Sequence, residues 1–92
     1  MPIRHEPEAS RYVLLDDEGD FAGEVEYDTQ GDTLLLVRAE VPMERRGGGY
    51  GVTLVRETLE MIRDEKHGKV QPICPFIAKF MVKNPEFQAL RA

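Results

Sequence analysis

Residues 44–55, Glu-Arg-Arg-Gly-Gly-Gly-Tyr-Gly-Val-Thr-Leu-Val, place two arginines and four glycines at the start of an apolar pattern of helical period. A loop that opens a helix presents free backbone N–H groups, and the helix dipole adds partial positive charge. Such a segment therefore suits an anion, most often a phosphate. Glycines let a phosphate approach the main chain without meeting a Cβ atom, and Arg45 and Arg46 could add charge-assisted hydrogen bonds. The alternative is an ordinary helix entry without a ligand.

Two well-known phosphate-binding fingerprints do not fit this stretch. The dinucleotide fingerprint fails because Val52 or Leu54 stands where its third glycine is required. The P-loop fails because Thr53 and Leu54 stand where it requires Gly and Lys. The spacing that remains is Arg-x-x-Gly-x-Gly, formed by Arg46, Gly47, Gly48, Gly49, Tyr50 and Gly51.

The single cysteine, Cys74, is the second group that could do chemistry. It precedes Pro75, and proline favours the first position of a helix. A thiol at a helix N-terminus is stabilised as the thiolate, which is a nucleophile and a proton acceptor. Cys74 could equally line a cleft or act as a small buried apolar residue. A lone cysteine excludes an internal disulfide and favours a reducing compartment.

The elements that must position these groups follow from periodicity and turn residues. Polar turn clusters at 16–20 and 28–32 separate three strands, which predicts an antiparallel meander. An apolar stripe of Val52, Val55, Leu59 and Ile62 predicts the first helix, closed by Gly68. A right-handed crossover would make the last strand parallel to the third. The predicted strands are 11–15, 21–27, 33–41 and 69–73, and the predicted helices are 50–66 and 75–83. The expected fold is mixed α/β, in the order β-β-β-α-β-α.

Length and composition bound the protein class. The 92 residues predict a single domain, with residues 1–10 as a flexible lead-in, and no apolar run approaches the length of a membrane span. Residues 1–32 hold ten acids and two bases, whereas residues 33–92 hold ten bases and seven acids. That basic excess is too small to indicate nucleic-acid binding. His5 and His67 have no partners at metal-ligand spacing, so no metal site is expected. We expect a cytoplasmic protein, either a monomer or a weak dimer.

The Arg-x-x-Gly-x-Gly loop resembles the pyrophosphate loop of the GNAT acyl-CoA N-acyltransferases. The second half of the chain strengthens the likeness. "EVPMERRGGGYG" followed by "KVQPICPFIAKFMVKNPEF" is similar to a subgroup of very short GNAT domains with a Cys-Pro-Phe motif after the second parallel strand. Every element of that pattern is present in order, and the resemblance spans roughly residues 20–90.

The resemblance implies acetyl transfer from acetyl-CoA to an amine, in a fold whose two parallel strands splay apart around the pantetheine arm. The thioester would then lie near Glu40, Val41 and Cys74. Glu40 would be the general base for the attacking amine, although a solvated strand-end glutamate is the alternative. Cys74 would accept the acetyl group, accept a proton, or line the cleft. The implied cofactor contacts are Val41, Arg45, Arg46, Gly47, Gly48, Gly49, Tyr50 and Gly51.

Two departures from the family pattern limit what the resemblance implies. Val37-Arg38-Ala39 stands where small relatives often carry His-Thr, so that histidine is missing. The last helix has Phe80 and Met81 but no tyrosine to protonate a leaving thiolate. A non-catalytic coenzyme A-binding module is therefore the second hypothesis, and a purely structural interaction domain is the third. The acidic N-terminal part would favour a cationic amine as acceptor.

Overall fold

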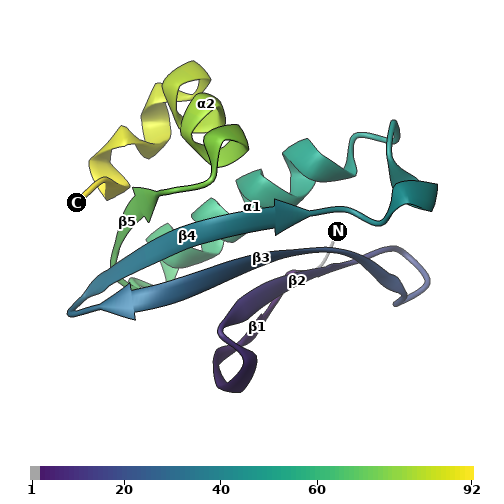
Figure 1. Cartoon of the computed structure of the whole chain (residues 1–92), viewed down its shortest axis with the longest axis horizontal. Helices are drawn as coiled ribbons and strands as arrows, with labels where there is room; N and C mark the ends of the chain where they lie inside the picture. Colours follow the sequence, from purple (N-terminus) through teal and green to yellow (C-terminus); the bar gives the residue numbers. More distant parts are fainter. Residues whose placement is uncertain (1–2) are drawn as a thin grey trace.

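The computed structural model describes residues 3–92 and contains one mixed five-stranded sheet, ordered β1-β2-β3-β4-β5 (Figure 1). The first four strands pair antiparallel, and β4 and β5 pair parallel across the crossover helix. The meander of β2, β3 and β4 and the parallel pairing of β5 were predicted, whereas the pairing of β1 was not. The strands are β1 (Ile3–Glu6), β2 (Arg11–Leu15), β3 (Phe21–Gln30), β4 (Thr33–Glu40) and β5 (Lys69–Pro72). The helices are α1 (Tyr50–Asp64) and α2 (Pro75–Lys83), with short 3-10 segments at Pro7–Ala9, Met43–Arg45 and Pro85–Leu90.

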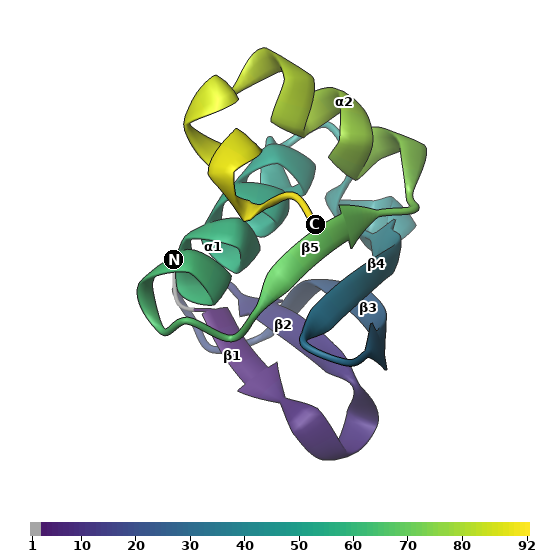
Figure 2. The same cartoon turned by 90° about the vertical axis from the view of Figure 1, so that its left-hand side faces the viewer.

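Helix α1 covers one face of the sheet, and α2 lies beside β5 (Figure 2). The buried stripe of α1 differs from the predicted one, because Val52 is 47% exposed and Leu54 and Thr58 are buried in its place. Successive residues lie ~100° apart around the helix axis. Measured around that axis, the centre of the observed stripe lies about 90° from Val52. The stripe consists of Leu54, Val55, Thr58, Leu59 and Ile62.

Strand β1 corrects the expectation that residues 1–10 are a flexible lead-in. Ile3 pairs with Leu14, and Glu6 pairs with Arg11, in an antiparallel ladder with β2. The Glu6 carboxylate also forms an ion pair with Arg11 at 2.8 Å. The strand went unnoticed because it is short and mostly polar. Met1 and Pro2 belong to the same predicted flexible lead-in, but they lie outside the described residues.

Two β-bulges shape the sheet, and the sequence analysis predicted neither. Ala22 is the extra residue of β3 between the pairs Leu14–Gly23 and Leu15–Phe21. A bulge shifts the alternation of faces by one residue. Phe21 is therefore exposed, although strict alternation along the strand would place it on the same buried face as Val25.

The second bulge lies in β4, where Val37 is the extra residue between the pairs Tyr27–Leu36 and Glu26–Arg38. The ladder with β5 ends at the same point, since its last pair is Leu36–Pro72. Strand β4 continues to Glu40 while β5 turns toward α2, so the two parallel strands diverge. A bulge bends its strand and raises the local twist. The bulge at Val37 therefore accounts for the divergence of β4 and β5 that the family resemblance implied.

Gly68 does not cap α1 as predicted. The left-handed residue after the helix is Lys66, at φ 55°. Gly68 itself has φ 144°, and a Cβ there would lie 2.3 Å from the backbone oxygen of Asp32. Glycine is required at this position because the α1–β5 connection crosses directly against the β3–β4 turn.

Two of the three phenylalanines in the C-terminal part of the chain are buried. Phe80 and Phe87 pack against each other with ring centroids 5.9 Å apart. Phe76, in contrast, is 45% exposed. It lies in the first turn of α2 and points toward Gly51, whose added Cβ would lie 3.5 Å from the ring.

Candidate functional site

The glycine-rich loop presents a row of unused backbone donors at the start of α1. Within residues 3–92, the backbone N–H groups from Gly47 to Val52 donate to no protein acceptor, and the first bond of the helix runs from Thr53 N to Gly49 O. Gly47 and Gly49 have φ values of 90° and 80°, a region that side chains disfavour. Gly49 is also the N-cap, so no side chain fills the end of the helix. The loop is thus open to an anion.

A cavity of about 410 Å³ lies directly beside this loop. Its walls come from the end of β4, the first turns of α1 and the first turn of α2. The β4 bulge sets the position of this cavity, because β4 is no longer paired with β5 beyond the bulge. The residues that line it are Ala39, Glu40, Val41, Arg46, Gly51, Leu54 and Phe76.

The two loop arginines have different surroundings. Arg46 lines the cavity, donates from Nε to the carbonyl of Val41 at 3.1 Å, and keeps its guanidinium largely exposed. Arg45 points the other way and forms an ion pair with Asp16 at 2.7 Å. Its guanidinium also lies over the Tyr50 ring, 5.7 Å from the centroid. Only Arg46 therefore faces the cavity as a cation.

Glu40 lies at the end of β4 with one side of its carboxylate toward the cavity. Oε1 accepts a hydrogen bond from Arg38 at 2.8 Å, and Oε2 lies 3.7 Å from the Arg46 guanidinium. Glu26 binds the same Arg38 from the neighbouring strand. The carboxylate thus has a short hydrogen bond on Oε1 and a longer ion pair with Arg46 on Oε2.

Cys74 is the N-cap residue of α2, as predicted, but its side chain is only 8% exposed. It belongs to the hydrophobic core cluster and does not line the 410 Å³ cavity. The Leu36 carbonyl accepts hydrogen bonds from the N–H groups of both Ile73 and Cys74, at 3.0 and 2.9 Å. Those two bonds fix the start of α2 against β4 at the point where the strands diverge.

The remaining titratable candidates lie away from this cavity. His5 and His67 lie among tyrosines near the far end of α1. Three carboxylates in the β2–β3 turn, Asp16, Glu18 and Asp20, approach within 4.8 Å of one another. Both oxygens of Asp16 are already engaged, by backbone N–H groups and by Arg45.

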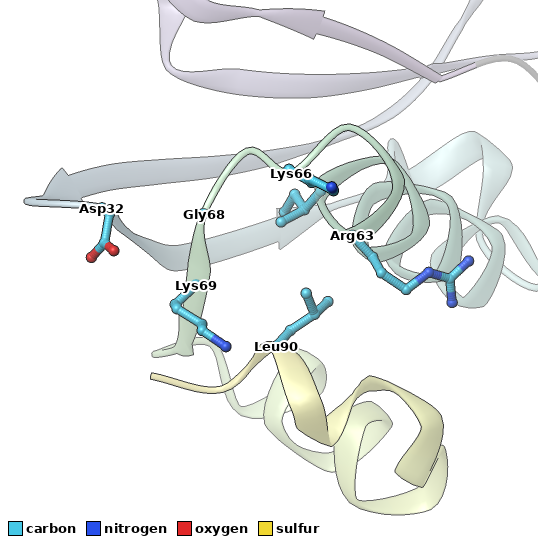
Figure 3. A pocket seen from close by; sticks show the side chains of 7 residues that line it. Asp32, Arg63, Lys66, Gly68, Lys69 and Leu90 are labelled. Atoms are coloured by element: carbon cyan, nitrogen blue, oxygen red, sulfur yellow. The ribbon is translucent and has the colours of Figure 1, made fainter.

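A second hollow of about 260 Å³ lies at the opposite end of α1 (Figure 3). Arg63 and Lys66 border it from α1 and its C-terminal turn, and Lys69 borders it from β5. Arg63 is paired with Asp64 at 2.8 Å, and Lys69 donates to the Ala89 carbonyl at 3.2 Å. At ~1.5 Å per residue, Arg63 lies about 18 Å along the helix from Gly51. This hollow is therefore separate from the loop and its cavity.

Comparison with known proteins identifies the fold and the family. The sequence model of the GCN5-related N-acetyl-transferase family matches residues 11–90. The chain belongs to this family. It is therefore an acetyltransferase by family, and the expectation of an N-acyltransferase is confirmed. The narrower likeness to a Cys-Pro-Phe subgroup stays a prediction.

One solved structure agrees with the GCN5-related fold over nearly the whole chain. An NMR solution structure of a candidate GCN5-like N-acetyltransferase from Staphylococcus aureus is 21% identical, with a TM-score of 0.69 over 99% of this chain and 87% of that one. Nourseothricin acetyltransferase is 32% identical over 65% of this chain and 36% of its own length, with a TM-score of 0.47. No curated protein sequence matches the chain. Across residues 3–92, no helix has the length and apolar character needed to cross a bilayer.

Two residues at or beside the candidate site were not identified from the sequence. Phe76 forms a wall of the cavity, and its position directly after Pro75, in the first turn of α2, was a usable signal. Asp16, the partner of Arg45, had been interpreted only as a turn residue. No local pattern marks that contact, because the two residues are far apart in the sequence.

Proposed function

We propose that this acetyltransferase uses acetyl-CoA and holds the pyrophosphate of the cofactor on the glycine-rich loop. The observation that carries the proposal is the row of free N–H groups from Gly47 to Val52 at the mouth of the cavity beside β4. Free N–H groups at a helix N-terminus are the donors that phosphates select. The positive φ angles of Gly47 and Gly49 support this binding mode. Glycine adopts such angles readily and has no side chain that would stand between the N–H donors and a ligand.

The cofactor would contribute an activated thioester, and the chain would contribute contacts along its length. The loop amides of Gly47, Gly48, Gly49, Tyr50 and Gly51 would bind the phosphates. Arg46 is better placed than Arg45 to add a charge-assisted hydrogen bond, because Arg45 is already paired with Asp16. The backbone of Val41, directly after β4, would border the acyl end.

Glu40 is our proposed general base. An amine must lose a proton before it can act as a nucleophile, and Glu40 is the carboxylate that lines the cavity. Arg38 holds Oε1 at 2.8 Å, whereas the ion pair of Oε2 with Arg46 is longer at 3.7 Å, so Oε2 would accept the ammonium proton directly or through a water molecule. Glu40 also brings negative charge to the acceptor side of the cavity, which favours a cationic amine such as a lysine side chain or a polyamine.

Cys74 is the second residue that the sequence suggested as catalytic, and its burial in the core supports a structural role at the start of α2 over a covalent one. A nucleophile must be reached by the acyl group, whereas this thiol lies within the core cluster. The backbone N–H of Cys74 has a clear use, because it anchors α2 to Leu36. We further propose a cytoplasmic location and a monomer or weak dimer.

A coenzyme A-binding module without turnover is the alternative, and the lack of tyrosine in α2 supports it. The deciding experiment combines binding of coenzyme A, measured by calorimetry, with release of free thiol from acetyl-CoA in the presence of spermidine or a lysine-containing peptide. Binding with amine-dependent release supports the enzyme. Binding without release under any amine supports the module. Absence of binding contradicts both.

A further inference from the structure

Asp16 is the one charged side chain that is buried among residues 3–92, with 8% of its surface exposed. It lies in the β2–β3 turn, outside the cavity and outside the glycine-rich loop. A buried carboxylate is costly unless its oxygens are hydrogen-bonded. The contacts of Asp16 therefore show what its burial achieves.

The two carboxylate oxygens of Asp16 have separate partners. Oδ1 accepts the backbone N–H groups of Glu18 and Asp20, both at 2.9 Å, and so closes its own turn. Oδ2 forms the 2.7 Å ion pair with Arg45. The N–H of Asp20 and, after it, the Arg45 guanidinium hold the pKa of Asp16 below its ordinary value. The residue is thus a fixed anion that joins the turn to the loop.

Arg45 transmits this contact to the start of α1. It ends the 3-10 segment Met43–Arg45, directly before Arg46 and the glycines. Its guanidinium lies over the Tyr50 ring, and Tyr50 is the first residue of α1. The ring in turn lies against Gly48, where an added Cβ would be 3.1 Å away. Asp16, Arg45 and Tyr50 therefore bracket the glycines from both ends.

We propose that Asp16 is a positioning residue for the glycine-rich loop, and that Arg45 supports the loop and does not contact phosphate. The proposal rests on the proposed binding of coenzyme A by that loop. Three glycines in a row have high conformational freedom, so a row of free N–H groups stays aligned only if the flanking residues are held. The Asp16–Arg45 pair holds one flank through charge, and Tyr50 holds the other by packing.

The decisive variant is Asp16→Asn. The amide oxygen of asparagine can still accept the N–H groups of Glu18 and Asp20, so the turn is kept. The amide nitrogen, however, presents a donor to the Arg45 guanidinium and abolishes the ion pair. Asp17→Asn removes the same charge from an exposed neighbour in the same turn and is the matched control. Arg45→Gln tests the other partner, and the double variant Asp16→Asn with Arg45→Gln can restore an uncharged hydrogen bond.

Two readouts separate this role from general damage. In the ligand-free protein, the NMR order parameters of backbone amides in residues 46–52 should fall in Asp16→Asn and Arg45→Gln, but not in Asp17→Asn, and those of residues 58–64 should not change. The Kd for coenzyme A and the KM for acetyl-CoA should rise about three- to tenfold with kcat unchanged, the scale of one partly exposed charged hydrogen bond. The double variant should recover part of both losses.

Direct phosphate contact by Arg45 predicts a different result. In that case Asp16→Asn would release Arg45, and the Kd for coenzyme A would stay unchanged or fall. Arg45→Gln would raise the Kd for coenzyme A. That outcome, or unchanged order parameters in the loop of Asp16→Asn, would overturn the proposal. If the wild type does not bind coenzyme A, the proposed function fails, while the order parameters still decide whether Asp16 orders the loop.

Discussion

The hydroxyl group of Tyr12 lies 2.8 Å from Nδ1 of His67, which ties strand β2 to the turn that follows helix α1. His5 of β1 stacks on the Tyr12 ring with centroids 4.4 Å apart, and its Nε2 lies 2.6 Å from the Tyr27 hydroxyl. We call His5, Tyr12, Tyr27 and His67 the Tyr–His cluster. It joins three strands and the end of α1, and it explains why the polar strand β1 is ordered.

The Tyr–His cluster predicts a loss of stability in mild acid. Burial, and then the neighbouring His67, lower the pKa of His5, while Glu65 and Glu8 oppose the shift. The unfolded chain then binds a proton near pH 6.5 that the folded chain resists, so stability is complete above that pH and falls as pH drops through the folded pKa. The slope is at most about 1.4 kcal/mol per pH unit for one proton. Urea unfolding at pH 7.5, 6.5 and 5.5 measures it.

His5→Gln is the control for this prediction, because glutamine keeps a hydrogen-bonding group but does not titrate. Its stability should be lower than that of the wild type at pH 7.5 and should vary less between pH 7.5 and 5.5. An equal pH slope in the two proteins would mean that His5 is not the responsible group.

Gly68→Ala should be far more destabilising than Gly31→Ala. Both positions have positive φ, but an added Cβ at Gly68 would lie 2.3 Å from the backbone of Asp32, whereas nothing lies within 4 Å at Gly31. The open position should cost about 1–2 kcal/mol of conformational strain. The blocked one should cost about 3 kcal/mol or more. Chemical denaturation of both variants gives the comparison, and equal losses would show that the α1–β5 connection can move aside.

Glu40→Gln should lower kcat by about 100-fold or more if Glu40 is the general base. Glu26→Gln is the matched control, because Glu26 also pairs with Arg38 but does not line the cavity. It should retain near wild-type kcat. The rate measured against pH in both variants provides the test, and a similar loss in both would assign the effect to Arg38 instead of to proton transfer.

Cys74→Ala should keep kcat within about threefold of the wild type if the buried thiol has no covalent role, and should lose about 1 kcal/mol or more of stability from the core. Intact mass spectrometry after incubation with acetyl-CoA gives an independent result. An acetyl increment that survives denaturation and disappears in Cys74→Ala would establish the covalent role that burial argues against.

Periodicity predicted the elements in which local pattern and tertiary packing agree. Helix α1, the three strands of the meander and the parallel pairing of β5 all followed from apolar spacing and turn residues. Val52 was assigned wrongly because its spacing matches a helical stripe, although packing on the sheet centres the buried face nearer Leu54 and Thr58. An apolar stripe at helical spacing thus predicts the presence of a helix more reliably than it predicts which face of the helix packs on the sheet.

Features that depend on contacts between distant segments could not be predicted in the same way. The Asp16–Arg45 pair joins a strand turn to the loop before α1 and exists only once the sheet is assembled. The β4 bulge did leave a signal. The inward residues Leu34 and Leu36 are followed by Ala39 and Val41, so the spacing of two changes to three at Val37.

That change of spacing has a consequence for how the site could be gained or lost. The cavity beside β4 depends on one surplus residue, Val37, in a strand that otherwise pairs continuously with β3. Removing Val37 would leave the partners of Leu36 and Arg38 on β3 unchanged while allowing β4 to follow β5 further along. The cavity therefore depends on one surplus residue in β4, and deleting Val37 should narrow it while the pairing of β4 with β3 is kept.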